Sequence, residues 1–345
     1  MRKIHLIAVA SLLVAALAAC VKEERDSSTQ PRRYEATREM MGTFVTVTVW
    51  AQSQQQANVA FGAAFVRLQE VDGTMSDYKP DSELSKINAE AADHPVAISD
   101  GMLAVLKASL MYSELTDGAF DITMRPLKKL WKSAERTGVP PDDDAIKAAL
   151  ASVGYRNVEL DEQNKTVRLL KDGMELDLGA IAKGYSADLA VEEMKRLNIP
   201  AGLVNVGGNI VVHGLPPGAK TWKIGIMDPA KRDERLPEVV HLTSGGVATS
   251  GDYERFFEIG GKRFSHVFDP RTGRPVEHIN SVTVVAPDGI TSDALSTALS
   301  VAGSDAGLAL ASKLTGVGAM FIVDGAEGGP AVVTSPGFDA YLKER

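Results

Sequence analysis

The sequence predicts an α+β fold in which mixed or antiparallel sheets are flanked by helices. Residues 43–50 alternate between a threonine-rich and a valine-rich face, a period of two that is typical of a strand. Apolar residues between 60 and 71 recur at steps of three and four, which predicts a helix after that strand. Beyond residue 155 short β-type runs dominate, with few helices between them. This order argues against a doubly wound parallel sheet.

Two further helices are indicated in the first half of the chain. One carries Leu103, Leu106 and Leu110, and the other begins at the acidic residues 142–144 and has Ile146 on its apolar side. We interpret the acidic residues as a helix start rather than a metal site, because prolines precede them and carboxylates are favourable there. The strands expected in the second half are 157–160, 166–169, 203–206, 210–213, 222–227, 239–242, 256–259, 263–268 and 281–286.

The composition is that of an ordinary folded protein and argues against nucleic acid as a partner. Of the 345 residues, 44% are hydrophobic and 24% are charged, which suffices for a large core without disulfides or further subunits. The net charge of -8 is spread along the chain, and basic residues do not cluster with aromatic ones. We therefore expect one or two compact domains and no nucleic-acid partner.

The N-terminus is typical of an export signal followed by a lipid anchor. Arg2 and Lys3 precede an apolar run too short to span a bilayer, and this run ends at Cys20 in a sequence that resembles a bacterial lipobox. We predict a lipoprotein signal peptide over 1–19, lipidation of Cys20 and a flexible, polar tether over 20–39. Alternatively, Cys20 is an ordinary small residue in a cleaved signal. Because it is the only cysteine, thiolate catalysis and thiolate metal sites are excluded in either case.

Four segments carry more polar, aromatic and glycine residues than a plain core needs. They are 41–43 with 75–88, 116–131, 177–188 with 204–209, and 249–253 with 265–273 and 292–298. In their order, spacing and residue identities, these segments resemble the ApbE family of flavin transferases. The resemblance covers about residues 40–335. Asn209 departs from the family pattern, which commonly has aspartate after this Gly-Gly pair, so a charge is not expected there.

The resemblance implies an ApbE-like domain over residues 40–340. The implied activity is a Mg²⁺-dependent transfer of FMN from FAD to a threonine of an acceptor protein, with release of AMP. Family acceptors carry an Asp-Gly-x-Thr motif and include subunits of membrane electron-transport complexes. We therefore expect a membrane lipoprotein facing the periplasm, at the inner membrane in view of these acceptors, although Val21 leaves the choice of membrane open. Two alternatives remain: an FAD pyrophosphatase that uses water, and a non-catalytic flavin-binding lipoprotein.

The resemblance also implies roles for particular residues. Contacts with FAD are expected from Met41, Tyr78, Ala119, Phe120, Asp121, Asp177, Lys183 and Phe268. The implied Mg²⁺ ligands are the Ala180 carbonyl, Asp293 and Thr297, which are hard oxygen donors that suit this ion. In catalysis, Lys183 would offset phosphate charge, Tyr78 would exclude water and His266 would accept the threonine proton.

The residues assigned to chemistry also have plain structural interpretations. Lys183 lies in the first turns of a predicted helix, where a cation opposes the helix dipole unless an anion binds there. Alternatively, this lysine is simply a solvated surface residue. His266 could merely fix the turn at residues 269–270. Asp293 and Thr297 share one helix face, but Asp293 could cap that helix while Thr297 lies at the surface.

Two of the predicted FAD contacts have equally simple alternatives. Asp177 could be a helix cap, and Tyr78 could belong to the core.

Overall fold

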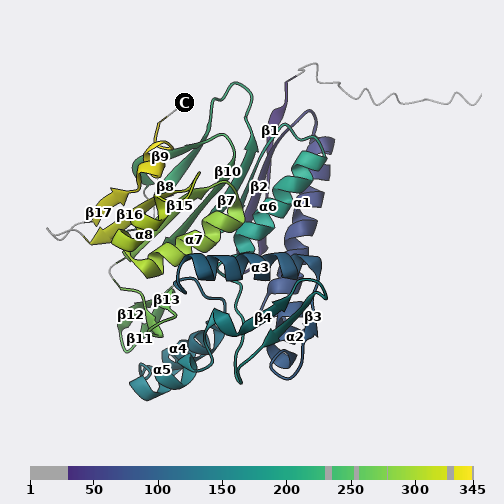
Figure 1. Ribbon diagram of the computed structural model, residues 1–345. Coiled ribbons are helices and arrows are strands. Elements are labelled where there is room, and N and C mark those ends of the chain that lie inside the picture. The colour runs from purple at the N-terminus through teal and green to yellow at the C-terminus, as the bar shows by residue number, and fades with distance from the viewer. Residues whose placement is uncertain (1–29, 230–234, 252–255, 278, 325–329, 344–345) are drawn as a thin grey trace, which may run out of the picture.

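The computed structural model describes residues 30–229, 235–251, 256–277, 279–324 and 330–343. The predicted signal peptide, Cys20 and the first part of the tether lie outside these residues. The α+β prediction is confirmed, because a large antiparallel sheet carries helices on one face and a smaller part with helices and short hairpins lies below it (Figure 1). In the described part of the chain, no helix has both the length and the apolar content of a membrane span.

The large sheet has eight strands, and the neighbouring strands run antiparallel. Its order is β1-β2-β6-β7-β10-β15-β16-β17. The strands are β1 (Arg32–Met40), β2 (Thr43–Ala51), β6 (Ala201–Val206), β7 (Asn209–Gly214), β10 (Gly245–Gly251), β15 (Ile279–Ala286), β16 (Gly318–Asp324) and β17 (Pro330–Thr334). The smaller part of the molecule is built mostly from the chain between residues 76 and 181 and from the chain between β10 and β15.

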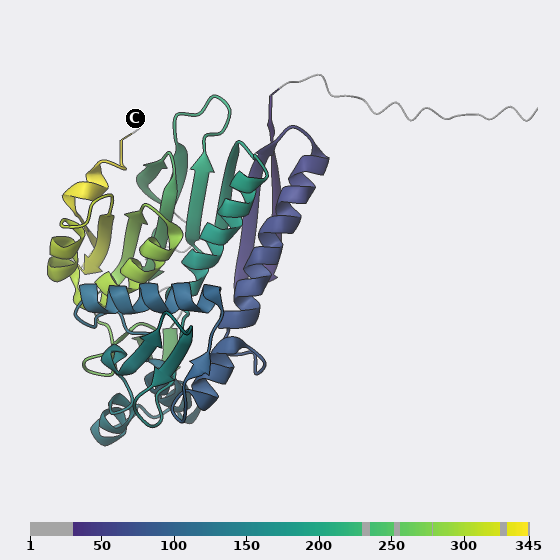
Figure 2. The same cartoon turned by 45° about the vertical axis from the view of Figure 1, so that its right-hand side comes forward.

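Four helices cover one face of this sheet (Figures 1 and 2). They are α1 (Gln54–Met75), α6 (Ala182–Arg196), α7 (Gly289–Ala302) and α8 (Ser304–Ala311). Because side chains alternate along a strand, Val284 of β15 and Phe321 of β16 point towards these helices. Each large side chain buried in this way contributes roughly 1.5–3 kcal/mol.

The opposite face of the sheet is covered by a hairpin and a short helix. The hairpin consists of β8 (Trp222–Met227) and β9 (Arg235–Leu242), and the helix is α9 (Pro336–Asp339). Met320 and Ile322, which flank Phe321 in β16, are buried on this side. The sheet is therefore the central layer of the larger part.

The smaller part lies below one end of the sheet (Figure 1). Its elements are α2 (Glu83–Glu90), α4 (Arg125–Thr137), α5 (Asp143–Leu150), η1 (Tyr155–Asn157), β3 (Val96–Ala97), β4 (Val158–Asp161), β5 (Thr166–Leu169), β11 (Phe256–Ile259), β12 (Lys262–Ser265), β13 (Phe268–Asp269) and β14 (Arg274–Pro275).

Asp142 caps α5 by accepting the Ala145 N–H at 2.8 Å, which confirms the acidic residues as a helix start. Trp131 of α4 packs against Phe268, with ring centres 5.7 Å apart, and joins the hairpins to this part.

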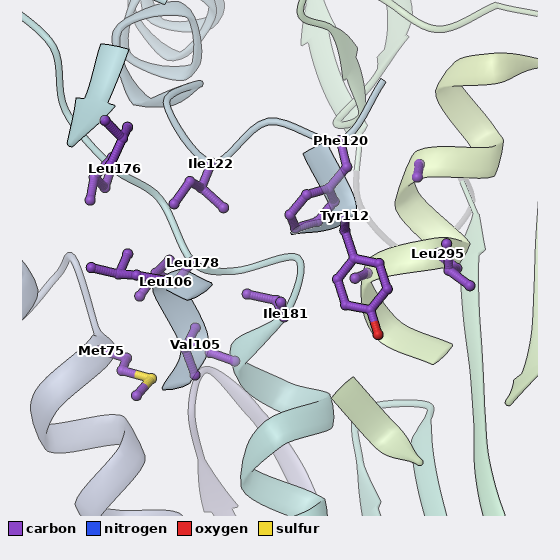
Figure 3. Close-up of a cluster of buried hydrophobic side chains, with 14 of the residues drawn as sticks. Met75, Val105, Leu106, Tyr112, Phe120, Ile122, Leu176, Leu178, Ile181 and Leu295 are labelled. Atoms are coloured by element: carbon purple, nitrogen blue, oxygen red, sulfur yellow. The ribbon is translucent and has the colours of Figure 1, made fainter. Parts of the chain in front are cut away.

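The helix α3 (Asp100–Leu115) lies across the junction of the two parts (Figure 2). Its Leu106 belongs to a buried cluster that also contains Ile181, just before α6, and Leu295 of α7 (Figure 3). The Tyr112 hydroxyl lies 2.7 Å from the Thr291 hydroxyl. This cluster fixes the segment before α6 relative to α7.

The predicted tether is wrong for its second half. Residues 32–39 belong to β1, which pairs with β2 along its whole length, from Arg32 opposite Ala51 to Met40 opposite Thr43. The strand is at the sheet edge, most of its side chains are exposed, and its hydrogen bonds come from β2. A polar edge strand needs little apolar burial, so the absence of an apolar period did not reveal it.

The helices α6 and α7 cross at two glycines. A Cβ atom on Gly184 would lie 2.1 Å from the Gly289 carbonyl oxygen, and one on Gly289 would lie 2.6 Å from the Gly184 oxygen. Both contacts involve backbone, which cannot move aside as the end of a flexible side chain can. The start of α6 therefore lies directly against the first turns of α7.

We predict that Gly184→Ala lowers the free energy of unfolding by about 1–3 kcal/mol, the usual cost of overpacking. Alanine is better than glycine inside a helix by roughly 1 kcal/mol, but here the clash with Gly289 outweighs that gain. Gly62→Ala on α1 is the matched control, since no atom lies within 4 Å of its new methyl group, and it should stabilise slightly. Urea denaturation measures both, and equal midpoints for the two variants would contradict the prediction.

Candidate active site

Lys183 and Asp293 meet where the start of α6 faces α7. The Lys183 Nζ lies 3.5 Å from Asp293 Oδ1 and donates a hydrogen bond to the Gly179 carbonyl at 2.8 Å. Asp293 is only 3% exposed, and its Oδ2 accepts the Gly184 N–H at 2.9 Å. The Asp293 carboxylate is thus an anion at this helix start, and it offsets the charge of Lys183 there.

Asp293 does not cap its own helix. The N-cap of α7 is Asp288, whose carboxylate accepts the Thr291 N–H at 2.9 Å. Asp293 lies in the second turn of α7, and Thr297 follows one turn later, half-buried, with its hydroxyl 3.4 Å from the Ser250 hydroxyl of β10. The shared helix of Asp293 and Thr297 is confirmed, and the capping alternative is excluded.

Three oxygen groups near this part of the chain are of the type that suits Mg²⁺. They are the Asp293 carboxylate, the Thr297 hydroxyl one turn later on α7, and the carbonyl of Ala180, the residue after the Gly179 that Lys183 contacts. Mg²⁺ usually keeps few protein ligands and completes its octahedron with water and substrate phosphate. In the described ranges, no group of three or more His, Cys, Asp and Glu side chains could hold a metal. A metal held there would therefore depend on such a mixed set of oxygens.

Asp177 lies on the other side of the same turn. Its Oδ2 accepts a hydrogen bond from Lys128 Nζ, and its Oδ1 accepts the Gly179 N–H, both at 2.8 Å. Burial raises the pKa of Asp177, but the charge and hydrogen bonds of these partners outweigh it and hold the pKa below its ordinary value. Gly179 thus joins Asp177 to Lys183, because its N–H donates to one and its carbonyl accepts from the other.

The basic face of α4 is a part of the site that sequence reasoning missed. Arg125 donates to the carboxylate and to the carbonyl of Asp77, each at 3.1 Å, and forms an ion pair with Glu175. These contacts hold the residue before Tyr78 next to the segment of Asp177. The basic residues Arg125, Lys128 and Lys129, which lie within the second family-like segment, are the signal that could have revealed this face.

Tyr78 does not belong to the core. Its side chain is 80% exposed, and the Lys132 Nζ lies 5.5 Å from the centre of its ring. An exposed aromatic ring is available to stack on another flat ring.

Of the predicted FAD contacts at residues 119–121, the first two are buried and the third is half-buried. Ala119 and Phe120 are 3% and 1% exposed. Asp121 accepts the Thr123 N–H at 2.7 Å and the Tyr155 N–H at 2.9 Å, and its pKa is raised because burial outweighs these bonds. With the side chains so occupied, we expect any contact between this loop and FAD to involve backbone atoms.

His266 lies half-buried in the bend between β12 and β13. The next residue, Val267, packs against Ala119 and against Val301 near the end of α7. Phe268 is 4% exposed and packs on Trp131, so its ring belongs to the core of the smaller part. These contacts bring the His266 segment to the loop of residues 119–121.

Met41 lies in the turn between β1 and β2. It adopts a left-handed φ of 53°, and Gly42 follows with φ 67°. The half-buried Met41 side chain packs against the cluster that contains Ile181 and Ala182.

Two cavities in the described part of the molecule are lined by other residues. One, of about 790 Å³, is lined by Arg274, Glu277 and Ser300 among others, and one of about 460 Å³ by Lys107 and Tyr155 among others. None of the residues predicted to bind FAD or metal lines either cavity. They give no reason to place FAD there.

Known proteins with similar sequences and folds identify the class of protein. The sequence profile of the ApbE family matches residues 41–321. A Treponema pallidum protein called FAD:protein FMN transferase is 35% identical over 84% of this chain and 84% of its own length. A Haemophilus influenzae protein of the same name is 38% identical over 71% of this chain and 73% of its own.

Solved structures give the same answer. The crystal structure of the ApbE protein from Thermotoga maritima has a TM-score of 0.81 and 33% identity and covers 91% of this chain and 100% of that chain. The flavinyl transferase ApbE from Pseudomonas stutzeri, in its apo form, has a TM-score of 0.79 and 32% identity and covers 91% of this chain and 98% of that chain. The fold and sequence are therefore those of a transferase. The chain belongs to the ApbE family.

The lowered pKa of Asp177 has a consequence for stability against pH. A carboxyl whose pKa is lower in the folded state stabilises the fold above its unfolded pKa of about 3.9, and this contribution is lost as the pH falls through the folded pKa. We predict that Lys128→Met costs about 1–2 kcal/mol at neutral pH, between the values for exposed and buried ion pairs. The difference from wild type should shrink below about pH 4.

Chemical denaturation across this pH range measures the effect. Lys132→Met, which removes the same charge one turn later on α4, is the control and should change stability by less than about 0.5 kcal/mol. A loss in Lys128→Met that does not vary with pH would show that packing of the lysine stem, not its charge, is responsible.

Proposed function

We propose that this chain transfers the FMN half of FAD to a threonine hydroxyl of an acceptor protein, in a Mg²⁺-dependent reaction that releases AMP. The observation that carries the proposal is the pairing of Lys183 with the buried Asp293 beside the hydroxyl of Thr297. A pyrophosphate needs a cation and a metal to offset its charge, and both can be held here. The name of the relatives, FAD:protein FMN transferase, supports the substrate.

The proposed step is a substitution at phosphorus. The threonine oxygen attacks the phosphorus on the FMN side of FAD, and the bond from this phosphorus to the bridging oxygen breaks. AMP leaves with the bridging oxygen, and the hydroxyl proton passes to a base, for which we propose His266. Lys183 would contact the pyrophosphate oxygens and offset their charge.

Asp293, Thr297 and the Ala180 carbonyl would hold Mg²⁺, which when bound offsets the charge of the pyrophosphate. The Asp293 Oδ2 already accepts the Gly184 N–H, so Oδ1 is the carboxylate oxygen we assign to the ion. Tyr78 would exclude water from the flavin side while the acceptor docks, which favours transfer over hydrolysis.

The acceptor and the location of the enzyme are part of the same proposal. We propose acceptors with an Asp-Gly-x-Thr motif, such as subunits of membrane electron-transport complexes. Lipidation at Cys20 would tether the enzyme at the periplasmic side of the inner membrane, where it could reach them. Cys20 lies outside the described residues.

One experiment separates this proposal from its two alternatives. The protein is incubated with FAD, Mg²⁺ and a purified acceptor that carries the motif, and then run on a denaturing gel. Flavin fluorescence on the acceptor together with AMP supports transfer. Free FMN and AMP without labelled acceptor support the pyrophosphatase, and no AMP with any divalent metal supports a flavin-binding protein without catalysis.

We predict that Asp293→Asn lowers Mg²⁺-dependent AMP release by about 10²-fold or more, in the range found for the loss of one charge-stabilising group. Asparagine keeps an oxygen for the Gly184 N–H and removes only the charge. Asp288→Asn is the control, because asparagine caps a helix as well as aspartate does. If Asp293→Asn kept wild-type turnover at limiting Mg²⁺ and lost only thermal stability, Asp293 would be a structural cap of α6 and the metal would bind elsewhere.

For His266→Ala we predict a transfer rate lower by about 10²–10⁴-fold with little change in FAD affinity, because a general base contributes to rate rather than to ground-state binding. Single-turnover flavinylation gives the rate, and quenching of flavin fluorescence gives the affinity. The exposed His94 provides the control variant His94→Ala. A parallel loss of FAD binding or of folding would assign His266 to the turn instead.

A further inference from the structure

The crossing of α6 and α7 is held by two matched sets of hydrogen bonds. On one side, the Gly184 N–H of α6 donates to Asp293 Oδ2 at 2.9 Å. On the other side, Asp188 of α6 accepts the Gly289 N–H at 2.7 Å and the Ile290 N–H at 2.8 Å from the start of α7. Each helix thus contributes a glycine N–H and, four residues later, a carboxylate that accepts from the other helix.

Asp188 fits closely into this crossing. It is half-buried, and a Cβ atom on Gly289 would lie 3.0 Å from its Oδ1. The pKa of Asp188 is raised to about 7, chiefly by burial and to a lesser extent by Asp288, while the two backbone N–H groups and Lys195 act in the opposite direction. Above that pH the carboxylate is charged and faces the N-terminus of α7, where the helix dipole favours an anion.

The helix α7 does not need Asp188 as a cap. Asp288 already caps α7 through the Thr291 N–H. A second carboxylate at the same helix end is repelled by the first, and this repulsion adds to the effect of burial on the pKa of Asp188. What Asp188 adds is a connection between two helices, and these are the helices that carry Lys183 and Asp293.

We propose that Asp188 is a positioning residue for the transfer site: its hydrogen bonds to the start of α7 hold Asp293 in place beside Lys183. Lys183 precedes Gly184, and Asp293 follows Gly289 by one turn, so the distance between them depends on how the helices cross. A rotation of α7 would displace Asp293 and Thr297 together, because both lie on one face. The inference rests on the proposed function where it names the metal ligands.

The first test does not depend on the proposed function. In Asp188→Asn the amide oxygen can accept one N–H, but its NH₂ group faces the other. We expect hydrogen exchange of the Gly184 amide, which is bonded to Asp293 and not to Asp188, to become faster by about tenfold. The measurement is made at about pH 8, where wild-type Asp188 is charged.

Glu192→Gln is the matched control, because it removes the same charge one turn later on α6, where Glu192 pairs with Lys195 at the surface. Its Gly184 exchange should equal that of wild type. Unchanged Gly184 exchange in Asp188→Asn would overturn the proposal. If Asp188→Asn does not fold, Asp188→Ser, whose hydroxyl can accept one of the two N–H groups, is measured in its place.

The second test is binding of Mg²⁺ to the protein by calorimetry, without turnover. Asp188→Asn should bind Mg²⁺ about 10–100-fold more weakly than wild type, as is usual when a group that orients a ligand is lost. Wild-type affinity in Asp188→Asn, with faster Gly184 exchange, would mean that Asp188 joins the helices without positioning the site, and would overturn the positioning role.

The two proposals fail in different ways. If Asp293→Asn binds Mg²⁺ as wild type does, the metal site of the proposed function is wrong. In that case the Gly184 exchange of Asp188→Asn still decides whether Asp188 holds Asp293 in place.

Discussion

The contact between Gly184 and Gly289 is the constraint on which the site depends. Because neither residue has a side chain, the backbones of α6 and α7 come close enough for Asp293 to accept the Gly184 N–H at 2.9 Å. The same approach leaves the Lys183 ammonium 3.5 Å from the other carboxylate oxygen. A lysine at a helix start and a buried carboxylate are each unfavourable alone, and the crossing lets each offset the other.

A single turn connects this pair to the rest of the site. The N–H of Gly179 donates to Asp177, and its carbonyl accepts from Lys183. Asp177 is in turn bonded to Lys128 of α4, the helix whose Arg125 holds the segment of Tyr78. The residues on α6 and α7 belong to the larger part, and those on α4 belong to the smaller part. The turn at Gly179 bonds to both sets, so its position helps to set their relative placement.

Strands whose own residues alternate or are strongly β-forming could be predicted from the sequence. Residues 166–169, 222–227 and 256–259 form strands with the predicted bounds. The strand β10 was not predicted, because its glycines are poor strand formers, yet α7 packs on them: a Cβ atom on Gly246 would lie 2.4 Å from the Asp288 carbonyl oxygen. The same limit applies to the site. The four-residue spacing of Asp293 and Thr297 is visible in the sequence, whereas the partners of Asp188 and Asp177 lie 101 and 49 residues away.

The two contacts of Lys183 differ in strength, and the difference bears on how the site can work. Its bond to the Gly179 carbonyl, at 2.8 Å, has the length of a normal hydrogen bond, while 3.5 Å to Asp293 Oδ1 exceeds that length and leaves mainly attraction between charges. Charge attraction is not directional, so Lys183 can move relative to Oδ1 without breaking a short hydrogen bond. The Gly184 N–H meanwhile holds Oδ2 in place. One oxygen therefore positions the carboxylate, and the other supplies negative charge to the site.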